Sequence, residues 1–221
     1  MSHADSALYV SKELGRNTYS FYSDTFGDET GKFIELSQEL RTAGSENEFE
    51  LYYQPKIDLV TSKITGMEAL LRWIKPRGGL LVPPTEFIPI LEEIGLMPEV
   101  GDWATNEVGE AMGLNPGQIG VNLSERRFSS LAYLKCFPID TIKVDRSFVR
   151  DMLVDKEDEM ILDAILAIAK LLNFAVVAEG VETKEQCDAL KEKGCKLGQG
   201  YLFSRPVRRD EMTKLLKKLL L

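Results

Sequence analysis

The stretch Ile64–Trp73, "ITGMEALLRW", contains a predicted β-strand, "ITGMEALL" (64–71), which places a glutamate inside an otherwise apolar run. A carboxylate buried in a strand costs several kcal/mol of folding free energy unless another group pairs with it. Arg72 lies four residues after Glu68, so an ion pair between the two explains this one position without any further function. The pattern becomes informative because it recurs elsewhere in the chain.

Five other predicted strands carry a polar residue inside or just after their apolar run. They are "FELYYQPKI" (49–57, with Gln54), "IGVNL" (119–123, with Asn122), "TIKVD" (141–145, with Lys143 and Asp145), "AVVAE" (175–179, with Glu179) and "GQGYLF" (198–203, with Gln199). A barrel of parallel strands gathers its carboxyl ends into one mouth, where enzymes of this architecture keep their chemistry. Two carboxylates, two amides and a lysine at such a mouth suit Mg²⁺ or Mn²⁺, which prefer oxygen ligands.

Helical segments are expected between these strands, and the regular alternation predicts an α/β fold with a mainly parallel sheet. The predicted helices cover 30–42, 85–94, 99–112, 129–136, 157–172, 183–193 and 209–220. Ahead of them, the sequence predicts a short helix to Leu14, a strand up to about residue 22 and a polar connector at 23–30.

Composition excludes several classes of function. The net charge of -8 argues against a nucleic-acid polymer as partner, because such a partner needs clustered basic surface. The one histidine, His3, leaves almost no room for histidine-based catalysis or zinc binding. Cys136, Cys187 and Cys195 lack paired spacing and are typical of free thiols in the cytoplasm. No apolar run predicts a membrane segment, and the first residues do not form a signal pattern.

The segment "MEALLRW" (67–73) resembles the signature of the EAL domain, the bacterial module that hydrolyses cyclic di-GMP. The segments "YYQPKID", "PPTEFIPILEEIG", "VNLS", "YLKCFPIDTIKVDRSFV", "VVAEGVET" and "GQGYLFSRP" resemble that family's other motifs, in the family's order. The resemblance covers most of residues 48–208. The start of the chain, "ADSALYVSKELGRNTY", resembles the closing helix and strand of a GGDEF domain, without any of its active site. The implied division is a GGDEF remnant at 1–28, a linker helix at 29–47 and an EAL domain at 48–221.

The resemblance implies a TIM-barrel-like fold with the site at its mouth, and it implies a role for each matching residue. Glu68 and Asn122 would bind metal, while Glu179 and Gln199 would hold metal or its water. Lys143 would assist catalysis together with Glu179. The implied ligand-binding residues are Gln54, Leu70, Arg72, Pro84, Phe203 and Pro206, and Glu182 would brace a loop.

Each of these assignments has a structural alternative. Prolines 84 and 206 are also typical of a helix start and a turn, and Leu70 and Phe203 are typical core residues. Lys143 also fits a solvated strand end. Glu182 also fits a surface cap before the helix that follows Thr183.

One part of the family pattern is missing. In the family, the "VNLS" strand is followed by helix, strand, helix and strand, which supply a metal-binding glutamate and the aspartate pair of "DDFGTG". Here "VNLSERRF" runs directly into "SSLAYLKCF" at Phe128–Ser129, and no "DDFG" occurs in the 221 residues. Roughly 170 residues follow Phe49, against about 250 in a typical barrel, so about two strand–helix units are absent.

The shortened pattern leaves three hypotheses open. In the first hypothesis, the chain is a degenerate EAL module that has a cyclic di-GMP-binding or regulatory role and holds at most one metal ion, weakly. Alternatively, it is an active phosphodiesterase yielding the linear dinucleotide, if the missing segment is supplied by a longer protein or a partner chain. A third hypothesis is a non-functional fragment or a protein-interaction surface. Strand edges left by the gap predict a partly open sheet or a homodimer.

Overall fold

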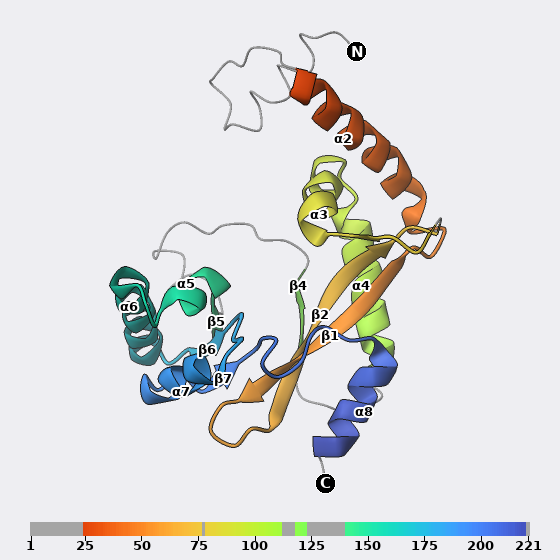
Figure 1. Ribbon diagram of the computed structural model, residues 1–221. Helices are drawn as coiled ribbons and strands as arrows, with labels where there is room; N and C mark the ends of the chain where they lie inside the picture. Colours follow the sequence, from red (N-terminus) through yellow and green to blue (C-terminus); the bar gives the residue numbers. More distant parts are fainter. Residues whose placement is uncertain (1–23, 77, 112–117, 123–139, 220–221) are drawn as a thin grey trace. The chain divides into compact units, whose positions relative to one another are not determined.

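The computed structural model describes residues 24–76, 78–111, 118–122 and 140–219, and these divide into two compact units (Figure 1). One unit contains residues up to Glu50 together with Arg72–Asp102, and the other contains Leu51–Leu71 together with Trp103 onward. The described helices are α2 (Asp24–Ala43), α3 (Pro84–Glu93), α4 (Met97–Ala111), α5 (Arg146–Asp151), α6 (Lys156–Leu172), α7 (Lys184–Glu192) and α8 (Arg209–Leu219). The described strands are β1 (Phe49–Asp58), β2 (Ile64–Ile74), β3 (Leu81–Val82), β4 (Gln118–Asn122), β5 (Thr141–Val144), β6 (Ala175–Ala178) and β7 (Leu197–Gly198).

The first unit is built around the fully buried rings of Trp73 and Phe87, whose centroids lie 5.8 Å apart in an edge-to-face arrangement. The indole N–H of Trp73 donates to Glu48 Oε2 at 2.8 Å, which satisfies a buried donor and a buried carboxylate together. Helix α3 begins at Pro84, where the missing proline N–H costs no helical hydrogen bond. Leu91 of α3 is also fully buried, so one face of this helix closes the core.

The strands form one connected sheet in the order β3-β2-β1-β7-β6-β5, with β4 paired to β2. Strands β5, β6 and β7 are parallel, as are β2 and β4, whereas β1 is antiparallel to β7. Parallel neighbours need long crossovers, and α5–α6 and α7 supply them. This arrangement confirms the predicted α/β alternation.

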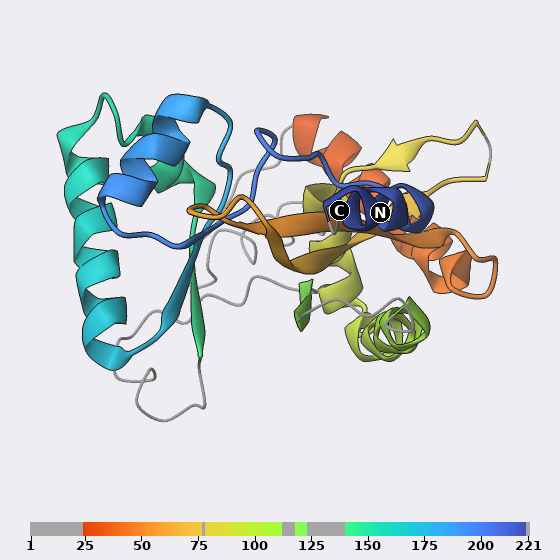
Figure 2. The same ribbon diagram turned by 90° about the horizontal axis from the view of Figure 1, so that it is seen from below.

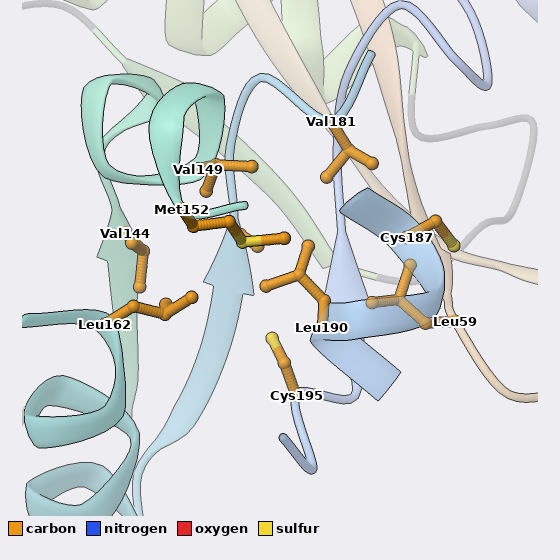
Figure 3. Close-up of a cluster of buried hydrophobic side chains, with 10 residues drawn as sticks. Leu59, Val144, Val149, Met152, Leu162, Val181, Cys187, Leu190 and Cys195 are labelled. Atoms are coloured by element: carbon orange, nitrogen blue, oxygen red, sulfur yellow. The ribbon is translucent and has the colours of Figure 1, made fainter. Parts of the chain in front are cut away.

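The core of the second unit lies between the β5–β6–β7 strands and the helices α5, α6 and α7. Its fully or nearly fully buried members include Val144, Met152, Leu162 and Leu190. Figure 3 shows Met152 and Leu190 extending toward each other across this core. Helices α6 and α7 lie side by side in both views of the ribbon (Figures 1 and 2). Ion pairs from Lys193, at the end of α7, to α6 tie the two helices together.

Most predicted elements match within two residues, and the differences have local causes. The predicted connector at 23–30 is wrong, because α2 already begins at Asp24. The predicted strand 198–203 is also wrong beyond Gly198. A Cβ on Gly200 would lie 2.2 Å from the Val181 carbonyl oxygen, so the chain is squeezed against a neighbouring loop. It then turns, and the N–H groups of Phe203 and Ser204 both donate to the Gly200 carbonyl.

Two short elements, β3 and α5, were not predicted, since two and six residues are too few to show a repeating hydrophobic pattern. The predicted helix at 129–136 and the predicted elements before residue 23 lie outside the described residues. None of the helices that the structure describes combines the length and the apolar composition needed to cross a bilayer.

Candidate functional site

Four of the predicted site residues meet at one place in the second unit. Glu68 lies in β2 and Lys143 in β5, while Glu179 and Gln199 directly follow β6 and β7. The backbone fixes the last two residues: Glu179 N–H donates to the Val144 carbonyl and Gln199 N–H to the Ala178 carbonyl. These bonds continue the parallel ladder past the strand ends. The side chains therefore converge as the sequence predicted.

A lysine bridges the two carboxylates of this site. Lys143 Nζ lies 2.6 Å from Glu68 Oε1 and 2.6 Å from Glu179 Oε1. The side chain of Glu68 is 4% exposed, against 28% for Glu179 and 34% for Lys143. Lys143 is therefore not the solvated strand end that the sequence left open. It is the counter-ion of a largely buried acid pair.

The bridge alters the acid–base behaviour of its members. Burial alone would lower the pKa of Lys143, but the charges of Glu68 and Glu179 outweigh burial and raise it. Burial raises the pKa of Glu179, and Lys143 offsets only part of that rise. Ionised Glu179 therefore depends on the ammonium beside it.

Two amides complete the site. Gln199 Nε2 donates to Glu68 Oε2 at 2.7 Å and to Gln54 Oε1 at 2.8 Å, and Gln54 Nε2 donates to the Ser204 carbonyl at 2.9 Å. Gln54, Glu68 and Gln199 are all buried. Gln199 Oε1 is buried and has no hydrogen-bond partner within the described part of the chain. It is an oxygen donor available to a ligand.

The oxygen atoms of the site match the ligand preference of a hard divalent metal ion. Glu68, Glu179 and the orphaned oxygen of Gln199 are the hard oxygen donors that Mg²⁺ and Mn²⁺ prefer. Their chemistry suits one such ion, which would compete with the Lys143 ammonium for the two carboxylates. Among the described residues, no group of three or more acidic, histidine or cysteine side chains could hold a metal.

Asn122, the remaining predicted metal ligand, ends β4. That strand is parallel to β2, with Asn122 opposite Leu70 and Gly120 opposite Glu68. Leu70 is half-buried and follows Glu68 on the same face of β2, because alternate residues of a strand share a face. Asn122 therefore belongs to the strand next to the site.

The other predicted ligand-binding residues fall into two groups. Phe203 and Pro206 follow β7 in the second unit, and Phe203 packs against the core of that unit, as its structural alternative expected. Arg72 and Pro84 belong to the first unit. Arg72 is half-buried in β2, and Pro84 occupies the first turn of α3.

The loop-bracing role of Glu182 stays a prediction, and the structure shows a neighbouring residue, Gln186, that binds the backbone of this loop. The Glu182 side chain is exposed, while its backbone N–H donates to Gln186 Oε1 at 2.8 Å. Buried Gln186 also accepts from Thr183 N–H and donates to the Arg150 carbonyl. Thr183 caps α7 in a complete capping box. The signal for Gln186 was present in the spacing "TKEQ", which places Gln three residues after the cap.

Lys56 was also missed. It shares the β1 face of Gln54, two residues earlier, and burial lowers its pKa, while Glu68 partly restores it. The alternation in "YYQPKI" carried this signal.

A family model, curated proteins and solved structures all match this chain. The family model of the EAL domain matches residues 37–130 and 118–206. The chain is 29% identical to the bifunctional diguanylate cyclase/cyclic di-GMP phosphodiesterase MucR of Pseudomonas aeruginosa, over 96% of this chain and 41% of that protein. Among solved structures, the EAL enzyme Bd1971 in its cGMP-bound form has a TM-score of 0.77 at 27% identity, covering 86% of this chain and 71% of that one. The PaMucR phosphodiesterase in complex with c-di-GMP has a TM-score of 0.74 at 28% identity, covering 80% and 99%.

These matches also locate the shortening. The family model matches in two pieces that overlap at residues 118–130, and this overlap contains the Phe128–Ser129 junction where the family's strand–helix units are missing. The alignment with MucR runs over 280 positions although the chain has 221 residues, so MucR has several tens of residues without a counterpart here. The chain spans 34–41% of the length of the first curated relatives it matches. The chain belongs to the EAL domain family, and its fold is a shortened form of that family's α/β, TIM-barrel-like fold.

Proposed function

We propose that this chain is a cyclic di-GMP-binding module of bacterial second-messenger signalling in which hydrolysis has been lost. Family membership supports the ligand, since the MucR phosphodiesterase was solved with c-di-GMP. The sequence retains Gln54, Arg72, Pro84 and Pro206 at the family's ligand-facing positions. Gln54 is also pre-positioned, because its amide bonds to Gln199 and to the Ser204 carbonyl.

The loss of hydrolysis rests on the small number of acids at the site, where Lys143 bridges the two carboxylates of Glu68 and Glu179. Metal-assisted phosphodiester hydrolysis of the family type needs acids that hold two dications roughly 4 Å apart and clamp both oxygens of an in-line displacement. Glu68 and Glu179 carry two negative charges, and Lys143 already neutralises one. The sequence contains no "DDFG" segment to add more.

EAL phosphodiesterases are metal-dependent in general, and a single Mg²⁺ or Mn²⁺ fits this site in kind. Glu68, Glu179 and Gln199 Oε1 would hold it, with Asn122 on the adjacent strand. Such an ion supplies charge neutralisation and a lowered pKa of water. Gln199 would keep Glu68 oriented through its Nε2 hydrogen bond. Lys143 would remain a cation facing the ligand phosphates.

Calorimetric titration with cyclic di-GMP, with and without Mg²⁺, tests the binding proposal. We expect saturable binding of one ligand per chain. The matched control is Gln54→Leu, which removes an amide of the pocket and should weaken binding severalfold. Absence of heat at high micromolar ligand would refute binding and leave an interaction surface or a remnant.

A turnover assay with Mn²⁺ tests the loss of hydrolysis, and no linear dinucleotide should appear. The alternative function is an active phosphodiesterase, which family membership favours. It predicts product from the wild type and none from Glu68→Ala. Equal product from both proteins would indicate a contaminant.

A non-functional fragment is the third candidate, and a thermal melt separates it from the others. A sharp cooperative transition supports a folded module, whereas broad unfolding supports the fragment.

We further infer the organisation around this site. The proposed division remains a GGDEF remnant at 1–28, a linker helix at 29–47 and the EAL domain at 48–221, and α2 overlaps the proposed linker. A homodimer through the EAL surface or the strand edges is proposed, to be tested by sedimentation. A cytoplasmic location is proposed because Cys187 and Cys195 are free and buried.

A further inference from the structure

A cavity of about 750 Å³ lies in the second unit, at the end of the strands opposite the candidate site. Its lining includes Ala175 and Leu197, the first residues of β6 and β7. Glu179 and Gln199 follow the other ends of the same strands, and neither lines the cavity. The walls are the second half of α6 and the turn between α7 and β7. The volume is within the usual range for small-molecule sites.

The floor of this cavity is apolar. Leu166, Phe174, Val176 and Leu197 line it, and all four are half-buried. Buried Cys195 lines it as well, and burial raises the pKa of its thiol, so the sulfur stays neutral. Such a floor fits a hydrocarbon or aromatic body.

The acidic groups at the rim are already committed to internal partners. Asp163 accepts from Lys193 at 2.9 Å, and Lys193 also donates to Glu159 at 2.8 Å. Asp58 Oδ1 accepts two backbone N–H groups of its own turn, at 2.7 and 2.9 Å. The N–H of Thr61 is the largest cause of its lowered pKa. The carboxylate oxygens of Asp58 and Asp163 are therefore already engaged in hydrogen bonds, which makes them poor ligands for a cation.

Two lysines at the rim have no comparable partner. Lys170 and Lys196 line the cavity, both are exposed, and neither has an ion pair within the described residues. The charge of Lys196 contributes to the lowered pKa of Asp58, after the hydrogen bonds that Asp58 accepts from Thr61 and Val60. The carboxyl end of α6 adds partial negative charge here, but the N–H groups of Asn173 and Phe174 bond to its last-turn carbonyls. The lining carries three lysines against two aspartates, in a chain whose net charge is -8.

We propose that this cavity binds a small amphipathic anion, with its ring or chain on the apolar floor and its acidic group between Lys170 and Lys196. Charge complementarity carries the choice of an anion, since the rim acids are paired internally and these lysines are not. The apolar floor carries the choice of an amphipathic body over inorganic phosphate. The site is separate from the proposed cyclic di-GMP pocket.

Two fluorescent probes of matched shape test this proposal on the full chain. Anilinonaphthalene sulfonate carries a ring system and one negative charge, and N-phenylnaphthylamine carries the same rings without the charge. The sulfonate should bind at one site per chain and more tightly than the uncharged probe. Neutralising both lysines (Lys170→Gln with Lys196→Gln) should weaken sulfonate binding by about tenfold and leave the uncharged probe unchanged.

The matched control is Lys184→Gln, an exposed lysine at the opposite end of α7, which should bind the sulfonate as the wild type does. Ala167→Trp, at an exposed lining position, should fill the cavity and abolish binding of both probes. Thermal melts confirm that each variant is folded. Equal affinity for the two probes, or unchanged sulfonate binding in the double variant or in Ala167→Trp, would overturn the proposal.

Discussion

Removing the ammonium of Lys143 probes the central arrangement of the site. The substitution Lys143→Met keeps most of the apolar stem and leaves Glu68 and Glu179 facing each other without a counter-ion. Lys143 Nζ lies 2.6 Å from each carboxylate, so both contacts are lost at once. The loss destabilises ionised Glu68 more than ionised Glu179, because the Glu68 side chain is 4% exposed and water cannot replace the lysine.

The magnitude follows from burial. Breaking a buried ion pair by removing one partner costs about 3–5 kcal/mol, whereas an exposed pair is worth about 0–1 kcal/mol. Here one acid is buried, while the lysine and the second acid are about one-third and one-quarter exposed. We expect the free energy of unfolding to fall by about 2–3 kcal/mol at neutral pH.

Urea denaturation across pH measures this loss and its origin. The raised pKa of Lys143 means that its contribution is fully present below the unfolded-state pKa and is lost as pH rises through the folded-state pKa. In the methionine variant, the deficit should also shrink as pH falls, because burial raises the pKa of Glu179 and its unpaired carboxylate becomes protonated. Lys143→Arg retains the charge and should lose less. A methionine variant as stable as the wild type at neutral pH would refute the bridging role.

Three further predictions test other parts of the structure. Gln199→Leu leaves the buried Glu68 carboxylate with one hydrogen bond fewer, and urea denaturation should show a loss of about 2 kcal/mol. Gly200→Ala places a Cβ against neighbouring backbone and should prevent a cooperative melt, whereas Gly109→Ala, an open helix position, should stabilise by about 0.5–1 kcal/mol. Trp73→Phe removes the indole donor to a buried carboxylate and should cost about 1–3 kcal/mol in the same assay, and an unchanged midpoint would contradict that bond.

Periodicity predicted the long elements well because their burial is regular. The observed β2 buries Met67, Ala69, Leu71 and Trp73 on one face, and this alternation is legible in the sequence. The end of the predicted strand 198–203 was not legible. Its apolar letters fit a strand, but contact of Gly200 with a loop some twenty residues earlier turns the chain. Contacts between distant segments are invisible to a local pattern.

In the candidate site, too, the local pattern predicted some features, and contacts between distant segments decided the others. The convergence of Glu68, Lys143, Glu179 and Gln199 could be predicted because parallel strand ends meet at one edge. Their bonding could not be predicted, since it depends on side-chain reach. The sequence suggested Arg72 as the partner of Glu68, and the structure gives that carboxylate to Lys143 and Gln199. The sequence pattern thus predicted which side chains lie together, and the structure shows which of them form hydrogen bonds.

Restoring the missing segment tests whether charge is what hydrolysis lacks. A chimera would carry the corresponding strand–helix units of MucR between Phe128 and Ser129, where the family match divides. The added acids would balance further positive charge beside Glu68 and Glu179, so Mn²⁺-dependent formation of the linear dinucleotide should appear. The same chimera with Glu68→Ala should be inactive, which separates this site from contamination. If the chimera melts cooperatively and binds cyclic di-GMP yet forms no product, then the retained residues are themselves incompetent. The lost aspartates would then not be the cause.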